Sequence, residues 1–316
     1  MLPIKLDRSQ TLAISAGIGA VCLACLPLVL NDFQLIIATE MLIMAIFALS
    51  LNLILGYGGM VHFGHAVFYG LGAFTLAILT RRYGVNPYVA MILAPCVSAL
   101  AGWLIGWLCV RRVELYFAIL TLAFGQLVYV VFLQAREITG GDEGLHGLPL
   151  PAWLGEPPAM YGFTLAVFVV CYALMWQLVR SPFILILKST RENPERARFL
   201  GVNVRQHQLI IFVVGAFFAG VAGMLMATEK RFASLDMLHW TTSAEPLLAS
   251  LLGGMFSLVG AGIGAAVLVF LNFTLSRLTS YWSLALGVLT VGLVLLAPNG
   301  LIGWLQTYRR PDDKRE

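Results

Sequence analysis

The residues that could do chemistry in this chain are few and isolated. His62 and His65 stand three positions apart, but no acidic or cysteine partner lies close enough in sequence to complete a metal site. Glu40 is the one clear charge within an apolar stretch, where a single carboxylate is typical of a snorkelling or capping residue. The sequence shows no catalytic triad and no paired carboxylates, so we predict no metal, no cofactor and no enzymatic activity.

Two further patterns also fall short of a chemical site. The Lys-Ser-Thr run at 188–190 resembles the end of a phosphate-binding loop, but Pro182 and Leu187 stand where that loop requires glycine. Cys22 and Cys25 form a CxxC inside an apolar segment with no histidine nearby, which is typical of packing residues. The chain therefore carries no nucleotide-binding motif of its own.

The elements that must carry these residues are membrane helices. Of the 316 residues 59% are hydrophobic and 11% are charged, against about 25% charged in ordinary soluble domains. The apolar runs are continuous rather than alternating, which excludes the strands of a lipid-facing β-barrel. The net charge of +4 is concentrated in a few loops, so we expect no nucleic acid partner.

Apolar segments recur along the chain with short polar breaks between them. We expect an all-α integral membrane protein, with about ten transmembrane helices in one domain covering residues 1–316 and with both termini in the cytoplasm. The segment 245–257 is short and contains two adjacent glycines, so a broken or re-entrant helix is an alternative there. If it crosses, 14 of the 20 Lys and Arg residues lie inside; if it does not, 11 do. The expected spans are 11–30, 34–55, 66–80, 86–110, 115–134, 161–179, 208–227, 245–257, 258–276 and 283–303.

A polar island from Arg180 to Arg205 interrupts this apolar sequence. It carries six basic residues, which predicts a cytoplasmic position because cationic loops stay on the inner side of the membrane. Asn193 and Pro194 form a helix-start signal and Gly201 a C-cap, so we expect a short helix between them. An anchor against anionic lipid explains the charge but not the helix. We therefore interpret residues 180–207 as a docking loop for a cytoplasmic protein.

Two glycine-rich stretches predict irregular backbone close to a translocation pathway. Four glycines between 56 and 64 interrupt a straight helix, and backbone that breaks at membrane depth must be buried in protein or line water. The stretch 139–147 is an acidic outer loop, suited to contact with a delivered solute or a delivering protein. A tight turn and a solvated connector are the respective alternatives. The residues expected along the pathway are Asn52, Tyr57, His65, Thr121, Gln126, Gly140 and Gly141.

Taken in order, these stretches resemble the permease subunits of branched-chain amino acid ABC importers, specifically the LivM-type subunit. The resemblance covers nearly the whole chain, and the combination of blocks is specific. The matching blocks are ALSLNL at 48–53, GYGG at 56–59, FGHA at 63–66, YFAILTLAF at 116–124, TGG at 139–141, GL at 144–145, REN at 191–193 with Ala197, LGVNV at 200–204, FFAGVAG at 217–223 and PNGL at 298–301.

This resemblance implies a type II ABC-importer permease in the cytoplasmic (inner) membrane, surrounded by lipid. Its implied partners are a LivH-type sister permease, two cytoplasmic ABC ATPase subunits that hydrolyse the ATP, and an extracytoplasmic solute-binding protein. The implied cargo is a branched-chain amino acid or a related small polar solute such as urea or an amide. Arg196 and Arg198 flank Ala197 where the family is richer in alanine. The implied ATPase-docking residues are Arg191, Glu192, Asn193, Glu195, Ala197, Leu200 and Gly201.

Two other classes need features that the sequence lacks. A secondary transporter of small organic solutes, the main alternative, needs coupling-ion groups at mid-depth and a detectable internal repeat. A membrane-embedded enzyme needs convergent catalytic groups within its spans. The substrate within the resembled family stays open, because its members are not well separated by sequence.

Overall fold

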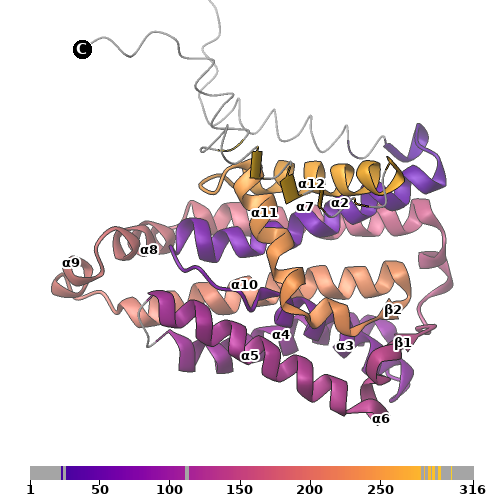
Figure 1. The fold of residues 1–316 in the computed structure, drawn as a ribbon, viewed down its shortest axis with the longest axis horizontal. Coiled ribbons are helices and arrows are strands. Elements are labelled where there is room, and N and C mark those ends of the chain that lie inside the picture. The colour runs from indigo at the N-terminus through magenta and orange to yellow at the C-terminus, as the bar shows by residue number, and fades with distance from the viewer. Residues whose placement is uncertain are drawn as a thin grey trace, which may run out of the picture.

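Long helices that run side by side between two ends make up nearly all of the structure (Figure 1). It is a computed structural model, and it describes residues 26–110 and 114–278 together with residues 23, 281, 284–285, 287–288, 291–292 and 300. Most of the expected spans 11–30 and 283–303 lies outside these residues. The CxxC at 22–25, most of the PNGL block and the C-terminal tail lie outside them too.

Six of the described helices are long and apolar enough to cross a membrane, so the chain is a multi-pass, all-helical membrane protein. Their bounds lie close to the expected spans. The helix expected at 208–227 starts four residues earlier, because the Asn203 side chain accepts a hydrogen bond from the Gln206 N–H and so begins this helix at Val204. The six are α2 (Asp32–Asn52) with its π-helical continuation η2 (Leu53–Tyr57), α4 (Pro87–Cys109), α5 (Glu114–Gln134), α7 (Pro157–Val179), α10 (Val204–Lys230) and α12 (Leu258–Leu278).

A shorter helix, α3 (His65–Arg81), also passes between the two ends. Its 17 residues fall below the about 20 that a perpendicular span needs. It is nevertheless largely buried, because it packs between α4 and α10. Close packing with α10 depends on glycine: a Cβ on Gly72 would strike the carbonyl of Gly220. α3 therefore belongs to the core of the bundle rather than to its lipid-facing surface.

The segment from 231 to 257 makes the same passage along a broken path. It starts beside Lys230, which forms an ion pair with Glu40 in the first half of α2, and it ends at Phe256, which lies against Arg191 beside the end of α2. The expected span 245–257 is thus not one helix: α11 has only ten residues, about 15 Å at 1.5 Å per residue. The passage consists of β2 (Phe232–Ala233), η5 (Leu235–Leu238), η6 (Trp240–Ser243) and α11 (Ala244–Gly253).

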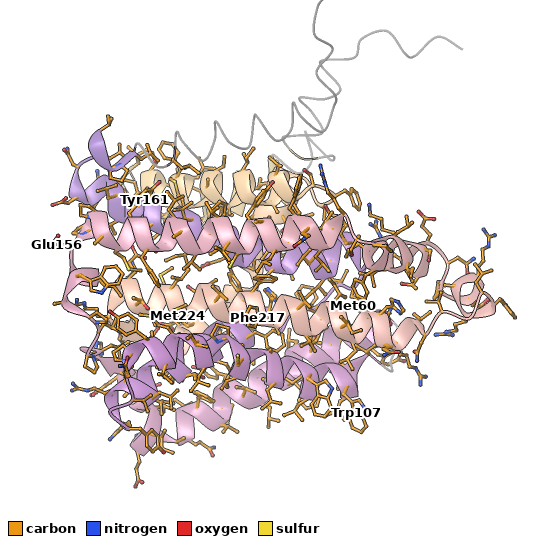
Figure 2. The ribbon with its side chains drawn as sticks, turned by 180° about the vertical axis from the view of Figure 1, so that it is seen from behind. Met60, Trp107, Glu156, Tyr161, Phe217 and Met224 are labelled. Carbon is orange, nitrogen blue, oxygen red and sulfur yellow. The ribbon has the colours of Figure 1, made fainter. Side chains whose placement is uncertain are left out.

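The core lies around α2 and α10, which are the most buried of the six long helices. α10 packs against α3, α4 and α2, and α2 in turn packs against α7, α11 and α12. Figure 2 shows Met224 of α10 inside the bundle and Trp107 of α4 on its outer face, in agreement with their buried and exposed side chains. α5 and α7 leave most of their apolar surface uncovered.

The two ends of the bundle are built differently (Figure 1). The docking-loop end carries α8 (Pro182–Glu192) and α9 (Pro194–Phe199), which extend beyond the long helices. The strand end carries α6 (Arg136–Thr139), η3 (Gly141–Glu143), β1 (Leu145–His146), η4 (Ala152–Gly155) and, close to the chain's start, η1 (Leu26–Leu28). There β1 and β2 pair antiparallel, with Leu145 opposite Ala233 and His146 opposite Phe232.

Candidate functional site

The docking loop contains the short helix that the sequence predicts, with both of its caps. The Asn193 side chain accepts a hydrogen bond from the Arg196 N–H at 2.9 Å, and Pro194 occupies the first turn, where its missing N–H costs nothing. Gly201 has φ +83°, a left-handed conformation that favours glycine, so the expected C-cap is confirmed. The local sequence thus fixes how α9 leaves α8 and returns to α10.

The tip of this loop exposes large apolar side chains. Phe199 is 90% exposed and Leu200 79% exposed, although both stand within a polar segment. Ala197 is buried against the rest of the chain, so its side chain faces away from any partner. The other residues expected to dock, Glu192, Asn193, Glu195 and Gly201, are exposed. The docking residues expected from the sequence do not include Phe199. The signal that could have found it is the pair of adjacent apolar residues, Phe199 and Leu200, within a polar segment.

Arg191 is exposed, as the expected docking surface requires, but its side chain also contacts the bundle. Its Nη1 donates a hydrogen bond to the Gly56 carbonyl at 2.6 Å, and its guanidinium lies 4.6 Å from the centroid of the Phe256 ring. Its aliphatic stem lies against Gly59, where an added Cβ would come within 2.9 Å of Cδ. Arg191 therefore connects α8 to the end of α2 and to the turn before α12.

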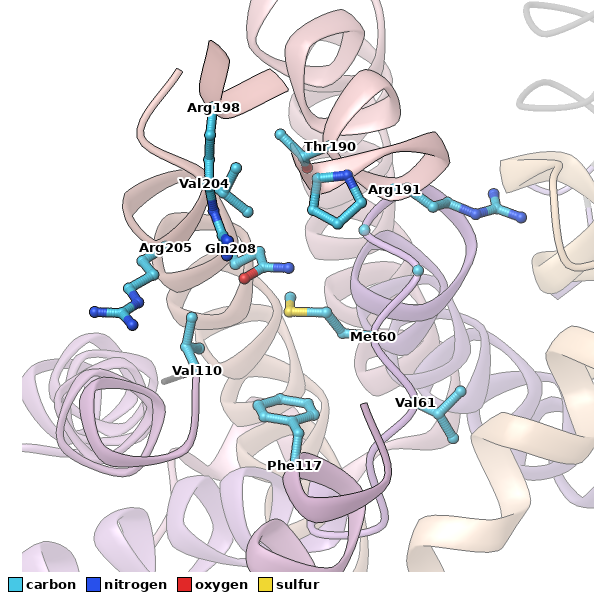
Figure 3. Close-up of a pocket in the computed structure, with 13 residues that line it drawn as sticks. Met60, Val61, Val110, Phe117, Thr190, Arg191, Arg198, Val204, Arg205 and Gln208 are labelled. Carbon is cyan, nitrogen blue, oxygen red and sulfur yellow. The ribbon is translucent and has the colours of Figure 1, made fainter. Parts of the chain in front are cut away.

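A cavity of about 320 Å³ opens beside these contacts (Figure 3). Met60 and Phe117 give it an apolar floor, while Arg198 from α9 points toward Gln208 of α10 at its mouth. None of the described residues that line it is acidic, so the mouth is cationic. The lining residues are Gly58, Gly59, Met60, Val61, Val110, Phe117, Thr190, Arg191, Pro194, Arg198, Val204, Arg205 and Gln208.

The residues expected along a pathway lie at three separate places. Asn52, Tyr57, His65 and Thr121 are buried near the break after α2, and none of them lines the cavity. Gln126 is exposed on α5, and Gly140 and Gly141 lie at the strand end. The structure therefore does not bring these seven residues together into one channel.

Within the buried group, three of the four side chains make specific hydrogen bonds. His65 Nε2 and Ser50 Oγ are hydrogen-bonded at 2.7 Å, and the His65 ring stacks on Phe47 with centroids 5.1 Å apart. Asn52 Nδ2 donates to the Met255 carbonyl at 2.8 Å, which fastens the end of α2 to the turn before α12. Thr121 Oγ1 donates to the Ala118 carbonyl in its own helix.

His62 is a buried polar residue with neither ring nitrogen hydrogen-bonded in the described part of the chain. It lies edge-on to Phe212, with centroids 5.2 Å apart, and to Phe117, the floor of the cavity. Phe117 therefore lies against both this histidine and the cavity. Among the described residues no group of three or more His, Cys, Asp or Glu side chains could hold a metal ion.

Glu40 lies in the first half of α2, and its side chain is partly exposed. It forms an ion pair with Lys230, the last residue of α10. The partner stands 190 positions away in sequence, so only the folded chain reveals the pair. The Glu40 carboxylate of α2 is therefore neutralised by a lysine of α10.

Comparisons with known proteins agree on one family. The family model described as branched-chain amino acid transport system / permease component matches residues 34–297. The permease protein LivM of the high-affinity branched-chain amino acid transport system of Salmonella typhimurium is 31% identical, covering 87% of this chain and 71% of that protein. The autoinducer 2 import permease LsrC of Photorhabdus laumondii is 29% identical over 67% of this chain and 63% of its own length.

A more distant relative is the fructose import permease FrcC of Rhizobium meliloti, 25% identical over 75% of this chain and 68% of its own length. No solved structure matches the chain. The family model covers most of the sequence, including the α2 break and the docking loop. The chain therefore belongs to the family of permease components of branched-chain amino acid transport systems.

Proposed function

We propose that this chain is the permease subunit of an ABC importer that carries a branched-chain amino acid, or a related small polar solute such as urea or an amide, across the cytoplasmic membrane. The observation that carries the proposal is the docking loop, which presents an exposed apolar tip on a capped helix. A chain without a nucleotide-binding motif needs a separate ATPase, and this tip suits one. The cargo is proposed from the printed function of the LivM relatives.

The proposed fold is the type II ABC-importer kind with about ten transmembrane helices. Six long helices, α3 and the broken segment 231–257 pass between the two ends in the described residues. The apolar sequences 11–30 and 283–303 add two more passages, and an even number puts both termini on the same side. The basic residues of the docking loop favour the cytoplasm for that side.

The proposed partners divide the surface between them. Two cytoplasmic ATPases bind the importer at its docking loops. In this chain Phe199 and Leu200 supply the apolar contact. The polar or small residues around them are Glu192, Asn193, Glu195 and Gly201. A LivH-type sister permease and lipid share the uncovered apolar faces of α5 and α7. An extracytoplasmic binding protein delivers solute at the strand end. ATP hydrolysis lies with the ATPases, and this chain is not an enzyme.

The proposed pathway runs past Asn52, Tyr57, His65, Thr121 and Gln126, with Gly140 and Gly141 at its outer mouth. These groups offer only weak hydrogen bonds, which suits a subunit that must release its cargo. Affinity then comes from the binding protein. The buried position of four of these residues means that α2 and its neighbours must move apart when solute passes.

The test is reconstitution of the complete importer in proteoliposomes with ATP inside and binding protein outside. We expect uptake of labelled leucine, isoleucine or valine that exceeds uptake of fructose, and no uptake when either the ATPase or this chain is omitted. Uptake that persists without the ATPase contradicts the proposed class. ATP-dependent uptake of urea or an amide in place of the amino acids keeps the class and changes the cargo.

A further inference from the structure

Arg191 sits at a junction of three elements that lie far apart in sequence. One side of the guanidinium donates to the Gly56 carbonyl in η2, and its face covers the Phe256 ring in the turn before α12. Its stem fills the space that a side chain at Gly59 would need. We call the set Asn52, Gly56, Gly59, Arg191, Met255 and Phe256 the α2–α8 junction.

The hydrogen bond from Arg191 satisfies a backbone carbonyl that has no donor within its own helix. The Gly56 carbonyl lies in the last turn of η2, where helical carbonyls lose their intrahelical donors. A charged donor at 2.6 Å satisfies it, and charge-assisted hydrogen bonds are about twice as strong as neutral ones. Movement of α8 away from the α2 break therefore breaks a strong contact, whereas movement together with it does not.

The third element is fastened to the same point by a separate contact. Asn52 Nδ2 donates to the Met255 carbonyl, and a Cβ on Gly56 would strike that same carbonyl. The α2 break and the turn at 254–257 thus lie in direct backbone contact beside the guanidinium. α8, the end of α2 and the start of α12 can shift together as one unit through Arg191.

We propose that Arg191 is a positioning residue that transmits movement of the docking loop to the α2 break and the turn before α12, rather than a contact for the ATPase. The inference rests on the proposed function, since it assigns one residue of that importer to coupling. The break carries Asn52 and leads into His65, both expected along the pathway. Arg191 then links ATP-driven movement outside the bundle to the residues that must separate within it.

A contact role and a positioning role predict different measurements on the reconstituted importer. Three quantities separate them: the amount of ATPase that copurifies with the permease, the rate of ATP hydrolysis, and the number of solute molecules moved per ATP. Arg191→Ala is expected to keep the first two within about twofold and to lower solute per ATP by about tenfold, a usual size for coupling between sites. Arg196→Ala, on exposed α9, is the matched control and leaves solute per ATP unchanged.

Further variants keep the test decisive if Arg191→Ala fails to insert. Arg191→Lys keeps the charge and stem but loses the planar stack on Phe256, so it lowers solute per ATP by a smaller factor. Phe256→Ala lowers solute per ATP as well. If both side chains act as one unit, the double variant Arg191→Ala/Phe256→Ala is no worse than Arg191→Ala alone.

Three outcomes overturn the inference: loss of copurifying ATPase with solute per ATP unchanged, a parallel fall of hydrolysis and transport, or additive effects in the double variant. An unmodified importer that moves no solute is a different result. It contradicts the proposed function itself, before any variant is compared.

Discussion

Two regions at opposite ends of the bundle, the tip of the docking loop and the β1–β2 pair, differ in how they place apolar side chains. At the docking-loop end Phe199 and Leu200 extend into solvent at the tip of a capped helix. At the strand end Leu145 and Ala233 are buried by the pairing of β1 with β2. The loop tip thus leaves an apolar surface exposed, while the strand pair buries its own.

The two ends also differ in the partners of their charged side chains. Near the strand end Glu40 forms an ion pair with Lys230, although both carboxylate oxygens of the adjacent Glu229 are buried without a hydrogen bond among the described residues. At the docking-loop end Arg198 lines a cavity that has no acidic residue among its described lining, and Arg191 donates a hydrogen bond to a backbone carbonyl.

The largest effect is expected from removing the apolar tip. Burial of a large apolar side chain contributes about 1.5–3 kcal/mol, and about 1.4 kcal/mol corresponds to a tenfold change in affinity. The double variant Phe199→Ser/Leu200→Ser should therefore weaken ATPase binding by about a hundredfold or more. The measurement is a titration of purified ATPase against the permease in nanodiscs.

The matched control for the tip stands at the other end. Tyr83 is also a large exposed side chain, 69% accessible, in the turn after α3. Tyr83→Ser should leave ATPase affinity unchanged. Equal weakening by both changes would mean that the tip is not the ATPase contact.

A smaller effect, about tenfold in transport, is expected from Gly201→Val. Gly201 and Gly147 have φ of +83° and +63°, and neither has another atom within 4 Å of an added Cβ. A side chain therefore costs about 1–2 kcal/mol of backbone strain at either position. Gly201→Val and the control Gly147→Val should both insert in the membrane, but only Gly201→Val should lower ATPase association, and ATP-driven uptake with it. A normal importer with valine at 201 would refute the docking assignment.

Local signals in the sequence were enough to predict α9, but not the contacts of its neighbours. Each cap of α9 depends only on residues about one turn away, so spacing alone predicts the effect of Asn193, Pro194 and Gly201. Arg191 bonds Gly56 across 135 positions, and Glu40 meets Lys230 across 190. Nothing in a linear pattern marks such pairs, because they depend on how the helices pack. The α2 break was predicted from its glycines, whereas the burial of Asn52 and His65 within it was not.

The smallest effect is expected at the strand-end ion pair. Glu40→Gln should retain uptake, because ATP rather than a proton drives the proposed cycle. Both side chains are partly exposed, so loss of the pair should cost at most about 1 kcal/mol of stability. Thermal unfolding and uptake measured on the same preparation check this. A variant of normal stability that no longer transports would assign Glu40 a role in coupling.

The most direct test of the central claim compares the two possible energy sources for uptake. Cells that carry the complete importer are treated with an uncoupler while cellular ATP is maintained, and a parallel sample keeps its proton gradient while ATP is depleted. The account predicts that solute uptake survives in the first sample and stops in the second. Uptake that collapses with the proton gradient and persists without ATP would contradict it and place the chain among secondary transporters.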